Sequence, residues 1–410
     1  MPLRALMVAP ALPSPGGNGL SMRLSLFLEA LQRIAQTDLI LIPILGDTAT
    51  LTVGDTPILR APLQPDTELA LILQLRDPGQ RLESFVRYGK STFAGCFSNA
   101  AWAQLAGRYA PGTYDIVHVA RSHLTPALKH FRGRAATTID LDEDDLASFT
   151  SVARLLRKQR RNYQADWQEQ EGRASDRMLG QVRGAVDLAF AASPAEALDI
   201  SLRHQFPVEY LPNAVALVPT RPSLRRNNLL FVGTLGYLPN NDGLHWFMES
   251  VLPRIRRHSA CRVVIIGSSP LPRLRAAARR NGVKLLEGIK NLEPHYRAAS
   301  AVIAPMRSGG GTRIKLLEAA SFGVPSIATP IAAKGLYSRD RPWGWVAGTP
   351  QQFADACLAA LGDAKEGAVR AARGRSEVSR NFNRAKVIND LAQSFRQLAE
   401  GRQNVDGRVN

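Results

Sequence analysis

A glycine-rich loop that leads into basic residues is the strongest chemical signal in the sequence. Residues 308–315 read SGGGTRIK and follow the apolar run 301–304, which has the character of a buried strand. The glycines free the backbone for conformations that are closed to bulkier residues, and a helix is expected to follow with Thr312 as its N-cap. Gly323 and Pro325 supply the signal that ends this helix.

The charges at the start of this expected helix favour an anion. Arg313 and Lys315 lie where acidic residues would normally complement the positive end of the helix dipole. A phosphate group held by the backbone N–H groups would offset the repulsion between these cations. Glu318 lies one turn further on, and its carboxylate can accept hydrogen bonds from sugar hydroxyls. The alternative is an ordinary surface pair between Lys315 and Glu318, worth about 0.2–0.5 kcal/mol.

The segment from Gly309 to Pro325, with Phe231-Val232-Gly233 upstream, resembles the donor-binding half of retaining glycosyltransferases of family 4. The resemblance is clearest over residues 228–336. It implies the GT-B fold, an α/β architecture in which two Rossmann-like parallel-sheet domains face a central cleft. The donor-binding residues expected on these grounds are Gly16, Gly17, Gly233, Gly309, Gly310, Gly311, Thr312, Arg313, Lys315 and Glu318. For Gly16 and Gly17 a bare tight turn is an equal alternative.

Two features depart from the usual pattern of that family. Many members carry a pair of glutamates separated by seven residues; Glu318 fits the second, but Gly310 stands at the first. Thr234 and Asp242 stand where members often carry an arginine and a lysine. The chain is therefore similar to a branch in which the Gly-Gly-Gly-Thr-Arg segment replaces these features. The departure bears on the identity of the sugar more than on nucleotide binding.

The size and composition suit a globular protein of two domains. The chain has 410 residues, of which 45% are hydrophobic, and a net charge of +17. This charge predicts attraction to polyanions, and peripheral contact with an anionic membrane is one expectation. Nucleic acid is not expected, because no zinc finger, basic zipper or aromatic-studded strand is present. No apolar run reaches the ~18–20 residues of a spanning helix, and no signal-peptide layout occurs, so we expect a cytoplasmic protein, with the inner face of the membrane as an option.

The domain boundaries follow from the order of the expected elements. Residues 1–215 form an acceptor-binding Rossmann-like domain, residues 222–382 form the nucleotide-sugar-binding domain, and residues 383–410 form a helix that crosses back to the first domain and a frayed tail. Strands are expected at 3–9, 39–45, 115–119, 135–139, 185–192 and 208–211, and then at 229–232, 263–266, 284–286, 301–304 and 326–328. Regular alternation of strands and helices implies parallel sheets with ligands at the carboxyl ends of the strands.

Three other segments of the chain carry open alternatives. His118 resembles the histidine at the cleft end of a family strand and is our candidate for contact with the transferred sugar or the acceptor, although a core histidine is the alternative and His123 competes. The acidic run 140–145 invites a metal, but helix-starting acids in a solvated loop or acceptor binding by Asp140 or Asp142 explain it without one. The amphipathic segment 76–97 suits either lipid headgroups or a plain domain helix.

These observations lead to a retaining, metal-independent glycosyltransferase of the hexosyltransferase type. The donor is a nucleotide diphosphate sugar, no further cofactor is expected, and the acceptor is a glycan or a lipid-linked molecule of cell-surface polysaccharide or glycoconjugate synthesis. One alternative is a non-catalytic GT-B module that binds a nucleotide sugar or serves as a scaffold. Another is an epimerase on the same fold, which needs acid and base carboxylates that the sequence does not identify.

Overall fold

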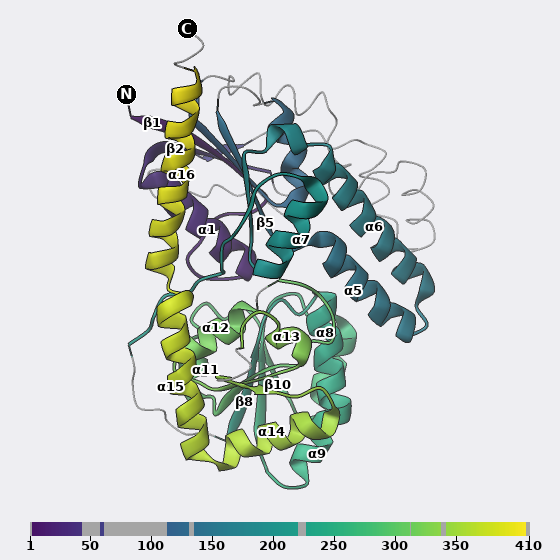
Figure 1. Ribbon diagram of the computed structural model, residues 1–410. Helices are drawn as coiled ribbons and strands as arrows, with labels where there is room; N and C mark the ends of the chain where they lie inside the picture. Colours follow the sequence, from purple (N-terminus) through teal and green to yellow (C-terminus); the bar gives the residue numbers. More distant parts are fainter. Residues whose placement is uncertain are drawn as a thin grey trace. The chain divides into compact units, whose positions relative to one another are not determined.

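The structure is a computed structural model that describes residues 2–42, 58–60, 113–130, 135–219, 227–311, 313–337 and 342–406. Thr312 and the amphipathic segment 76–97 lie outside the described residues. The chain divides into two compact units (Figure 1). Unit 1 comprises Met1–Pro212 and Val387–Asn410, and unit 2 comprises Asn213–Lys386.

Unit 1 is built on a seven-stranded sheet in which neighbouring strands are parallel, in the order β3-β2-β1-β4-β5-β6-β7. The strands are β1 Leu3–Ala9, β2 Ala35–Leu41, β3 Ile58–Arg60, β4 Ile116–Ala120, β5 Ala136–Asp142, β6 Leu188–Ala191 and β7 Val208–Tyr210. The central strand β4 is buried along its whole length, as expected for a parallel sheet covered on both faces.

The described helices of unit 1 begin at short polar residues. They are α1 Gly19–Gln32, the 3-10 helices η2 Ser122–His130 and η3 Arg183–Ala185, α5 Asp145–Lys158, α6 Asn162–Gly180, α7 Pro194–His204 and most of α16 Arg384–Asp406. Asn18, Asp144 and Ser193 cap α1, α5 and α7, each by accepting a hydrogen bond from a backbone N–H of the first turn. Helices α5 and α6 lie side by side (Figure 1).

Unit 2 is built on a six-stranded parallel sheet in the order β10-β9-β8-β11-β12-β13. The strands are β8 Asn228–Val232, β9 Arg262–Ile266, β10 Lys284–Leu286, β11 Ala301–Ala304, β12 Ser326–Ala328 and β13 Trp345–Val346. The five strands predicted for this half of the chain are confirmed, three with the predicted bounds and two that begin one residue earlier. The α/β fold class is confirmed by the two parallel sheets.

The helices of unit 2 alternate with its strands. They are α8 Leu238–Trp246, the π-helical turn η4 Phe247–Val251, α9 Leu252–Arg256, α10 Pro272–Arg280, α11 Glu293–Ala298, α12 Ile314–Ser321, α13 Pro330–Ala333, α14 Pro350–Gly362 and α15 Ala364–Asn381. Thr349 and Gln352 form a capping box that starts α14. No described helix combines the length and apolar character needed to cross a bilayer.

Three predicted boundaries are wrong. Strand β2 begins at Ala35, before the predicted 39–45, because the carboxylate of Asp38 is satisfied within the sheet by Tyr114 Oη at 2.7 Å and by Arg4. Strand β5 continues to Asp142, which places part of the acidic run inside the sheet. Helix α16 continues to Asp406, so residues 401–406 are helical where a frayed tail was predicted.

An aromatic cluster ties α16 into the core of unit 1. Phe27 of α1 stacks on His118 of β4 with ring centroids 4.3 Å apart. Phe395 of α16 meets the His118 ring at 5.7 Å and Phe190 of β6 at 6.0 Å, both edge-on. These four side chains are buried. A single helix from the end of the chain thereby closes the core that the first half of the chain begins.

We predict that Phe395→Ala lowers the free energy of unfolding by about 3–5 kcal/mol, because it removes a large buried ring and leaves a cavity. Urea unfolding monitored by circular dichroism measures this change. Arg396→Ala is the matched control, since Arg396 is the exposed neighbour on the same helix. Equal stability of the two variants would contradict the packing described above.

Candidate functional site

The glycine-rich loop of unit 2 lies at the carboxyl end of its sheet. Strand β11 ends at Ala304, the loop follows, and α12 begins at Ile314. The N-cap residue of α12 is Arg313, which makes no side-chain capping hydrogen bond, so the predicted cap at Thr312 is corrected by one residue. Gly323, with φ +69°, ends the helix as predicted: its N–H donates to Ala320 O, and Val324 N–H donates to Ala319 O.

Close backbone approach explains the glycines around this sheet edge. A Cβ atom at Gly267, which follows β9, would lie 1.8 Å from Gly233 O, so only glycine lets the ends of β8 and β9 meet. A Cβ atom at Gly233 would lie 3.0 Å from Lys315 Nζ and 3.2 Å from Asn240 Nδ2. At Gly309, with φ +92°, it would lie 3.0 Å from Pro239 Cγ. Gly233 therefore leaves the space that the Lys315 ammonium group occupies.

Lys315 is a buried cation without a carboxylate partner. Its Nζ donates to Asn240 Oδ1 at 3.0 Å and lies 3.9 Å from the centroid of the Phe231 ring. Asn240 is held in turn, because its Nδ2 donates to Thr234 O at 2.8 Å. Within the described part of the chain, Lys315 makes no ion pair. Burial lowers the pKa of Lys315 well below its usual range, the positive charge of Arg313 lowers it further, and Glu318 opposes both.

Two buried polar atoms at the ends of the loop have no hydrogen-bond partner among the described residues. They are Ser308 Oγ and Arg313 Nε. Arg313 is 9% exposed, and its Nη1 donates to Gly310 O. Buried polar groups are almost always satisfied in folded proteins, so unsatisfied atoms on both sides of a glycine loop indicate space for a polar ligand. Gly310 and Gly311 lie between them, and Gly311 has φ +71°.

Glu318 does not form the surface pair with Lys315 that the sequence left open. Its Oε2 accepts a hydrogen bond from Tyr296 Oη at 2.8 Å, and Tyr296 stacks on Phe322 with ring centroids 4.9 Å apart. Burial raises the pKa of Glu318 to about 7, against the opposing effects of the Tyr296 hydrogen bond and Lys315. One Glu318 oxygen is thus fixed by the core, which orients the carboxylate for a second donor.

Asp242 and Thr234 occupy the positions where the resemblance led us to look for basic residues. Asp242 lies in α8 and binds Arg307 through two hydrogen bonds of 2.7 and 2.9 Å. Arg307 follows β11, so it brings a cation to the same sheet edge from another part of the sequence. The Thr234 carbonyl orients Asn240. These roles were not predicted.

The first glycine loop of the chain lies in unit 1, before α1. Ser14 N–H donates to Ser21 O at 3.0 Å, which closes the loop as a turn. Gly17 has φ +108°, and a Cβ atom at Gly16 or Gly17 would meet no atom within 4 Å. These contacts agree with a tight turn whose open side has room for a ligand.

The position of His118 differs from the expected strand tip. His118 lies in the middle of β4, is fully buried and packs between Phe27 and Phe395. Its Nδ1 shares a hydrogen bond of 2.9 Å with Thr138 Oγ1. Burial lowers the pKa of His118 to about 3, and the charge of Arg23 acts in the same direction. These are the contacts of a neutral core residue, which was the alternative interpretation of the sequence.

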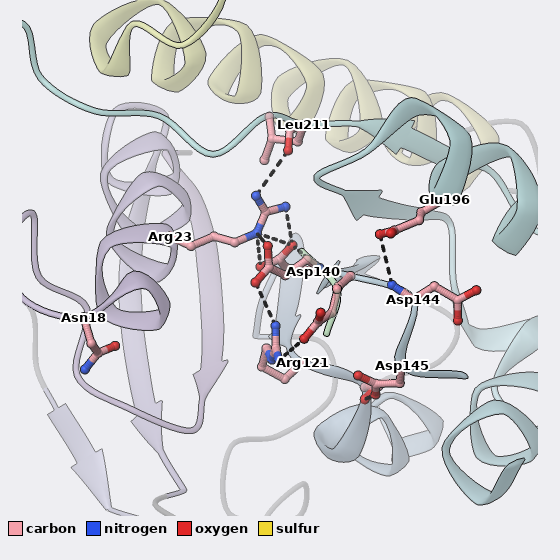
Figure 2. Close-up of polar contacts among 12 residues, drawn as sticks. Asn18, Arg23, Arg121, Asp140, Asp144, Asp145, Glu196 and Leu211 are labelled. Atoms are coloured by element: carbon pink, nitrogen blue, oxygen red, sulfur yellow. Dashed lines mark hydrogen bonds and ion pairs between the residues drawn. The ribbon is translucent and has the colours of Figure 1, made fainter. Parts of the chain in front are cut away.

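A buried ion pair supports the carboxyl end of the sheet in unit 1 (Figure 2). The guanidinium group of Arg23 donates to both oxygens of Asp140 at 2.7–2.9 Å, and its Nη1 donates to Leu211 O at 3.2 Å. Both side chains are fully buried. Asp140 is therefore not the solvated acid that one interpretation of residues 140–145 assumed. Arg23 was not predicted, although its place four residues before Phe27 on the apolar side of α1 was a signal.

Two residues beside this ion pair have left-handed backbone conformations. Arg121 follows β4 with φ +75°, and Asp142 ends β5 with φ +63°. Arg121 Nη1 donates to Asp142 Oδ2 at 2.9 Å, and the register of β5 against β6 shifts between Asp140 and Asp142. Both side chains are about one-fifth exposed. Left-handed residues other than glycine are strained, and such strain gathers at functional sites.

The rest of the acidic run starts α5, as one interpretation predicted. Asp144 caps the helix, and its other oxygen accepts a hydrogen bond from Arg203 Nη2 at 2.9 Å. Asp145 accepts one from Ser175 Oγ at 2.8 Å. Across the described ranges, no group of three or more His, Cys, Asp or Glu residues has the arrangement of a metal site.

Comparisons with known proteins agree with this architecture. The chain aligns with sucrose-phosphate synthase from Thermosynechococcus elongatus with a TM-score of 0.69 and 13% identity, over 97% of this chain and 100% of that one. The fold is GT-B. Residues 226–363 match the family described as Glycosyl transferases group 1. The match and the fold support a GT-B glycosyltransferase. The comparison with curated protein sequences gives no match.

Two further GT-B structures were determined with ligands. S. aureus TarM, in a complex with fondaparinux, alpha-GlcNAc-glycerol and UDP, has a TM-score of 0.69 and 9% identity over 96% of this chain and 99% of that one. Anabaena HepE, in a complex with UDP and glucose, has a TM-score of 0.66 and 14% identity over 96% and 100%. At these identities the likeness shows the fold alone.

The Arg23–Asp140 pair predicts a clear pattern in a double-mutant cycle. Arg23→Met or Asp140→Leu should each lower the free energy of unfolding by about 3–5 kcal/mol, because the remaining charge is buried without its partner. The double variant should recover most of this loss, since two apolar side chains replace a buried ion pair. Urea unfolding of all four proteins measures the coupling. Simple additivity of the two single effects would contradict a buried pair.

Glu318 predicts a pH dependence of stability. Its folded pKa of about 7 lies above the reference value of 4.5, so the folded state retains a proton that the unfolded state releases. The free energy of unfolding should therefore fall as the pH rises between these values, and Glu318→Gln should reduce this fall. Urea unfolding at about pH 5 and about pH 8 measures it. Glu249→Gln, at an exposed carboxylate, is the control; equal pH profiles for the two variants would contradict the assignment.

Proposed function

We propose that the protein transfers a sugar from a nucleoside diphosphate donor to a glycan or lipid-linked acceptor in the synthesis of cell-surface polysaccharide or glycoconjugate. The observation that carries this proposal is the buried Lys315 ammonium group without a carboxylate partner among the described residues, beside a glycine loop with unsatisfied polar atoms. The match of residues 226–363 to group 1 glycosyltransferases supports it. The nucleotide complexes of TarM and HepE add support by analogy of fold.

The donor diphosphate is proposed to bind at the start of α12. The cations of Lys315 and Arg313 face the same loop, and charge-assisted hydrogen bonds to phosphate oxygens would satisfy Arg313 Nε and compensate the burial of Lys315. Gly309, Gly310 and Gly311 allow the backbone to approach the phosphates. Thr312, outside the described residues, stays a candidate of the same loop. Gly233 is proposed to contribute by leaving space for Lys315.

Glu318 is proposed to bind the donor ribose. Its carboxylate accepts a hydrogen bond from Tyr296, and a second oxygen remains for a ribose hydroxyl. The pKa of about 7 implies that binding changes its ionisation, because a hydroxyl donor favours the charged form. Glu318 therefore contributes orientation, while Arg313 and Lys315 contribute charge.

The acceptor is proposed to bind mostly to unit 1, near the carboxyl ends of β4 and β5. Asp142 and Arg121 are partly exposed there and are held by the buried Arg23–Asp140 pair. Carboxylate oxygens accept hydrogen bonds from hydroxyl groups, which suits a glycan acceptor. Gly16 and Gly17 are proposed to contact the donor phosphate from their open loop. His118 is not included, because it is buried in the core.

The proposed reaction retains the anomeric configuration and needs no metal. Retention rests on the resemblance of residues 228–336 to family 4. As the glycosidic bond breaks, negative charge develops on the leaving diphosphate, and the cations of Arg313 and Lys315 stabilise it. No carboxylate of the donor region is free to act as a covalent nucleophile, since Glu318 is engaged by Tyr296 and Asp242 by Arg307. Attack on the same face, assisted by the departing phosphate, is therefore the mechanism we favour.

A non-catalytic GT-B module is the second candidate, favoured by Gly310 at the position of a family glutamate. Turnover of UDP, GDP and ADP sugars, with and without a lipid or glycan acceptor, separates the two candidates. Release of nucleoside diphosphate with sugar transfer supports the enzyme. Binding of a sugar nucleotide without transfer or hydrolysis across this panel supports the module.

We predict that Arg313→Ala and Lys315→Ala each weaken the binding of a nucleoside diphosphate by about 1.5–3 kcal/mol, because each removes charge-assisted hydrogen bonds. Isothermal titration calorimetry with UDP, GDP and ADP measures the change. Arg275→Ala is the matched control, since Arg275 is exposed and paired with Glu287. Unchanged affinity in both loop variants would contradict the site.

A further inference from the structure

One stretch of unit 2 carries an unbalanced positive charge that the donor site does not use. Residues 250–286 contain nine lysines and arginines and no aspartate or glutamate. The stretch covers the end of η4, α9, β9, α10 and β10. A surface helix usually mixes both signs of charge, so a run without acids requires a partner or a solvent-exposed face.

The fold gathers much of this charge at one place. Arg256, the last residue of α9, donates through Nη2 to Gly282 O at 3.5 Å. Gly282 lies in the turn between Arg280, which ends α10, and Lys284, which begins β10. Strand β10 pairs with β9, which begins at Arg262. We name the exposed residues at this amino end of the sheet the basic edge: Arg256, Arg257, Arg262, Arg279, Arg280 and Lys284.

The basic edge is not neutralised within the described ranges. None of its six residues makes an ion pair there, whereas Arg275 of the same stretch pairs with Glu287. Helix α14 packs on α9 and carries Asp355, whose carboxylate accepts a hydrogen bond from Gln351. The basic patch of α5 differs, because Arg157 pairs with Asp166 and Glu169 of α6. The basic edge is thus a surface of one charge sign.

A groove of about 530 Å³ marks where the basic edge ends. It lies along the same amino end of the sheet and is lined by residues before β8, β11 and β12, among them Asn227, Ser300 and Pro325. His258 and Asp363 also line it. Neutral and apolar side chains dominate the groove, so the positive surface is confined to the side of β9 and β10.

We propose that the basic edge docks unit 2 on an anionic lipid bilayer. Six exposed cations match the negative surface of a bilayer with acidic headgroups, to which each adds a comparable increment of affinity. No exposed aromatic side chain lies within residues 250–286 of the structure, and aromatic stacking is what single-stranded nucleic acids require. The donor loop lies at the opposite, carboxyl end of the same sheet. Docking therefore leaves the start of α12 accessible, and the proposal does not rest on the transfer activity.

Sedimentation with lipid vesicles tests the proposal. The full chain should sediment with vesicles of phosphatidylcholine and phosphatidylglycerol in equal parts, should not sediment with phosphatidylcholine alone, and should bind more weakly as salt rises. The variant Arg256→Gln, Arg262→Gln, Arg280→Gln, Lys284→Gln should bind on the order of several hundredfold more weakly, at about fivefold for each charge.

A matched control removes four charges from unit 1. Arg154→Gln, Lys158→Gln, Arg161→Gln and Arg173→Gln change exposed residues of the α5–α6 region, and this variant should sediment like the unchanged protein. Equal loss in both variants, or loss in neither, overturns the basic edge as the docking surface. Tighter binding to single-stranded RNA than to the anionic vesicles, lost in the basic-edge variant, overturns the lipid assignment. Unchanged calorimetric affinity for UDP, GDP and ADP in the basic-edge variant separates this result from any failure of the donor site.

Discussion

The burial of one ammonium group is the constraint on which the architecture of unit 2 depends. Lys315 is held by an amide oxygen of Asn240 and by the face of Phe231, which are weaker partners than a carboxylate. Burying a cation in this way costs stability, and a folded protein retains such a cost where function requires it. A bound anion removes the cost. The site is thus incomplete in energetic terms, and its missing partner is negatively charged.

The surrounding glycines follow from the same constraint. Gly233 leaves room for the ammonium group, and Gly267 lets the neighbouring strand approach Gly233. Side chains at these positions would push Lys315 away from Asn240 or separate β8 from β9. Unit 1 shows a related arrangement, in which a buried Arg23–Asp140 pair supports the strained residues Arg121 and Asp142. In both units buried charge fixes the carboxyl ends of parallel strands, where α/β proteins bind ligands.

The sequence predicted the features whose signals are local. Short apolar runs between turn residues located the strands of unit 2, and Gly323 with Pro325 located the end of α12, because these signals act within a few residues. It missed the partners of the buried charges: Asn240 lies 75 positions from Lys315, and Arg23 lies 117 positions from Asp140. Such pairs are set by the order of strands in the sheet. His118 was placed at a strand tip because the sequence does not show where a strand ends.

The pKa of Lys315 tests the central claim most directly. Nuclear magnetic resonance of the protein with isotopically labelled lysine can follow this ammonium group through a pH titration, with assignment by Lys315→Arg. Free protein should show a pKa well below the usual range for lysine, since burial is not offset by a carboxylate. Saturating nucleoside diphosphate should raise it, because a phosphate then stabilises the charged form. A normal pKa in the free protein, or one that the nucleotide leaves unchanged, would contradict the account.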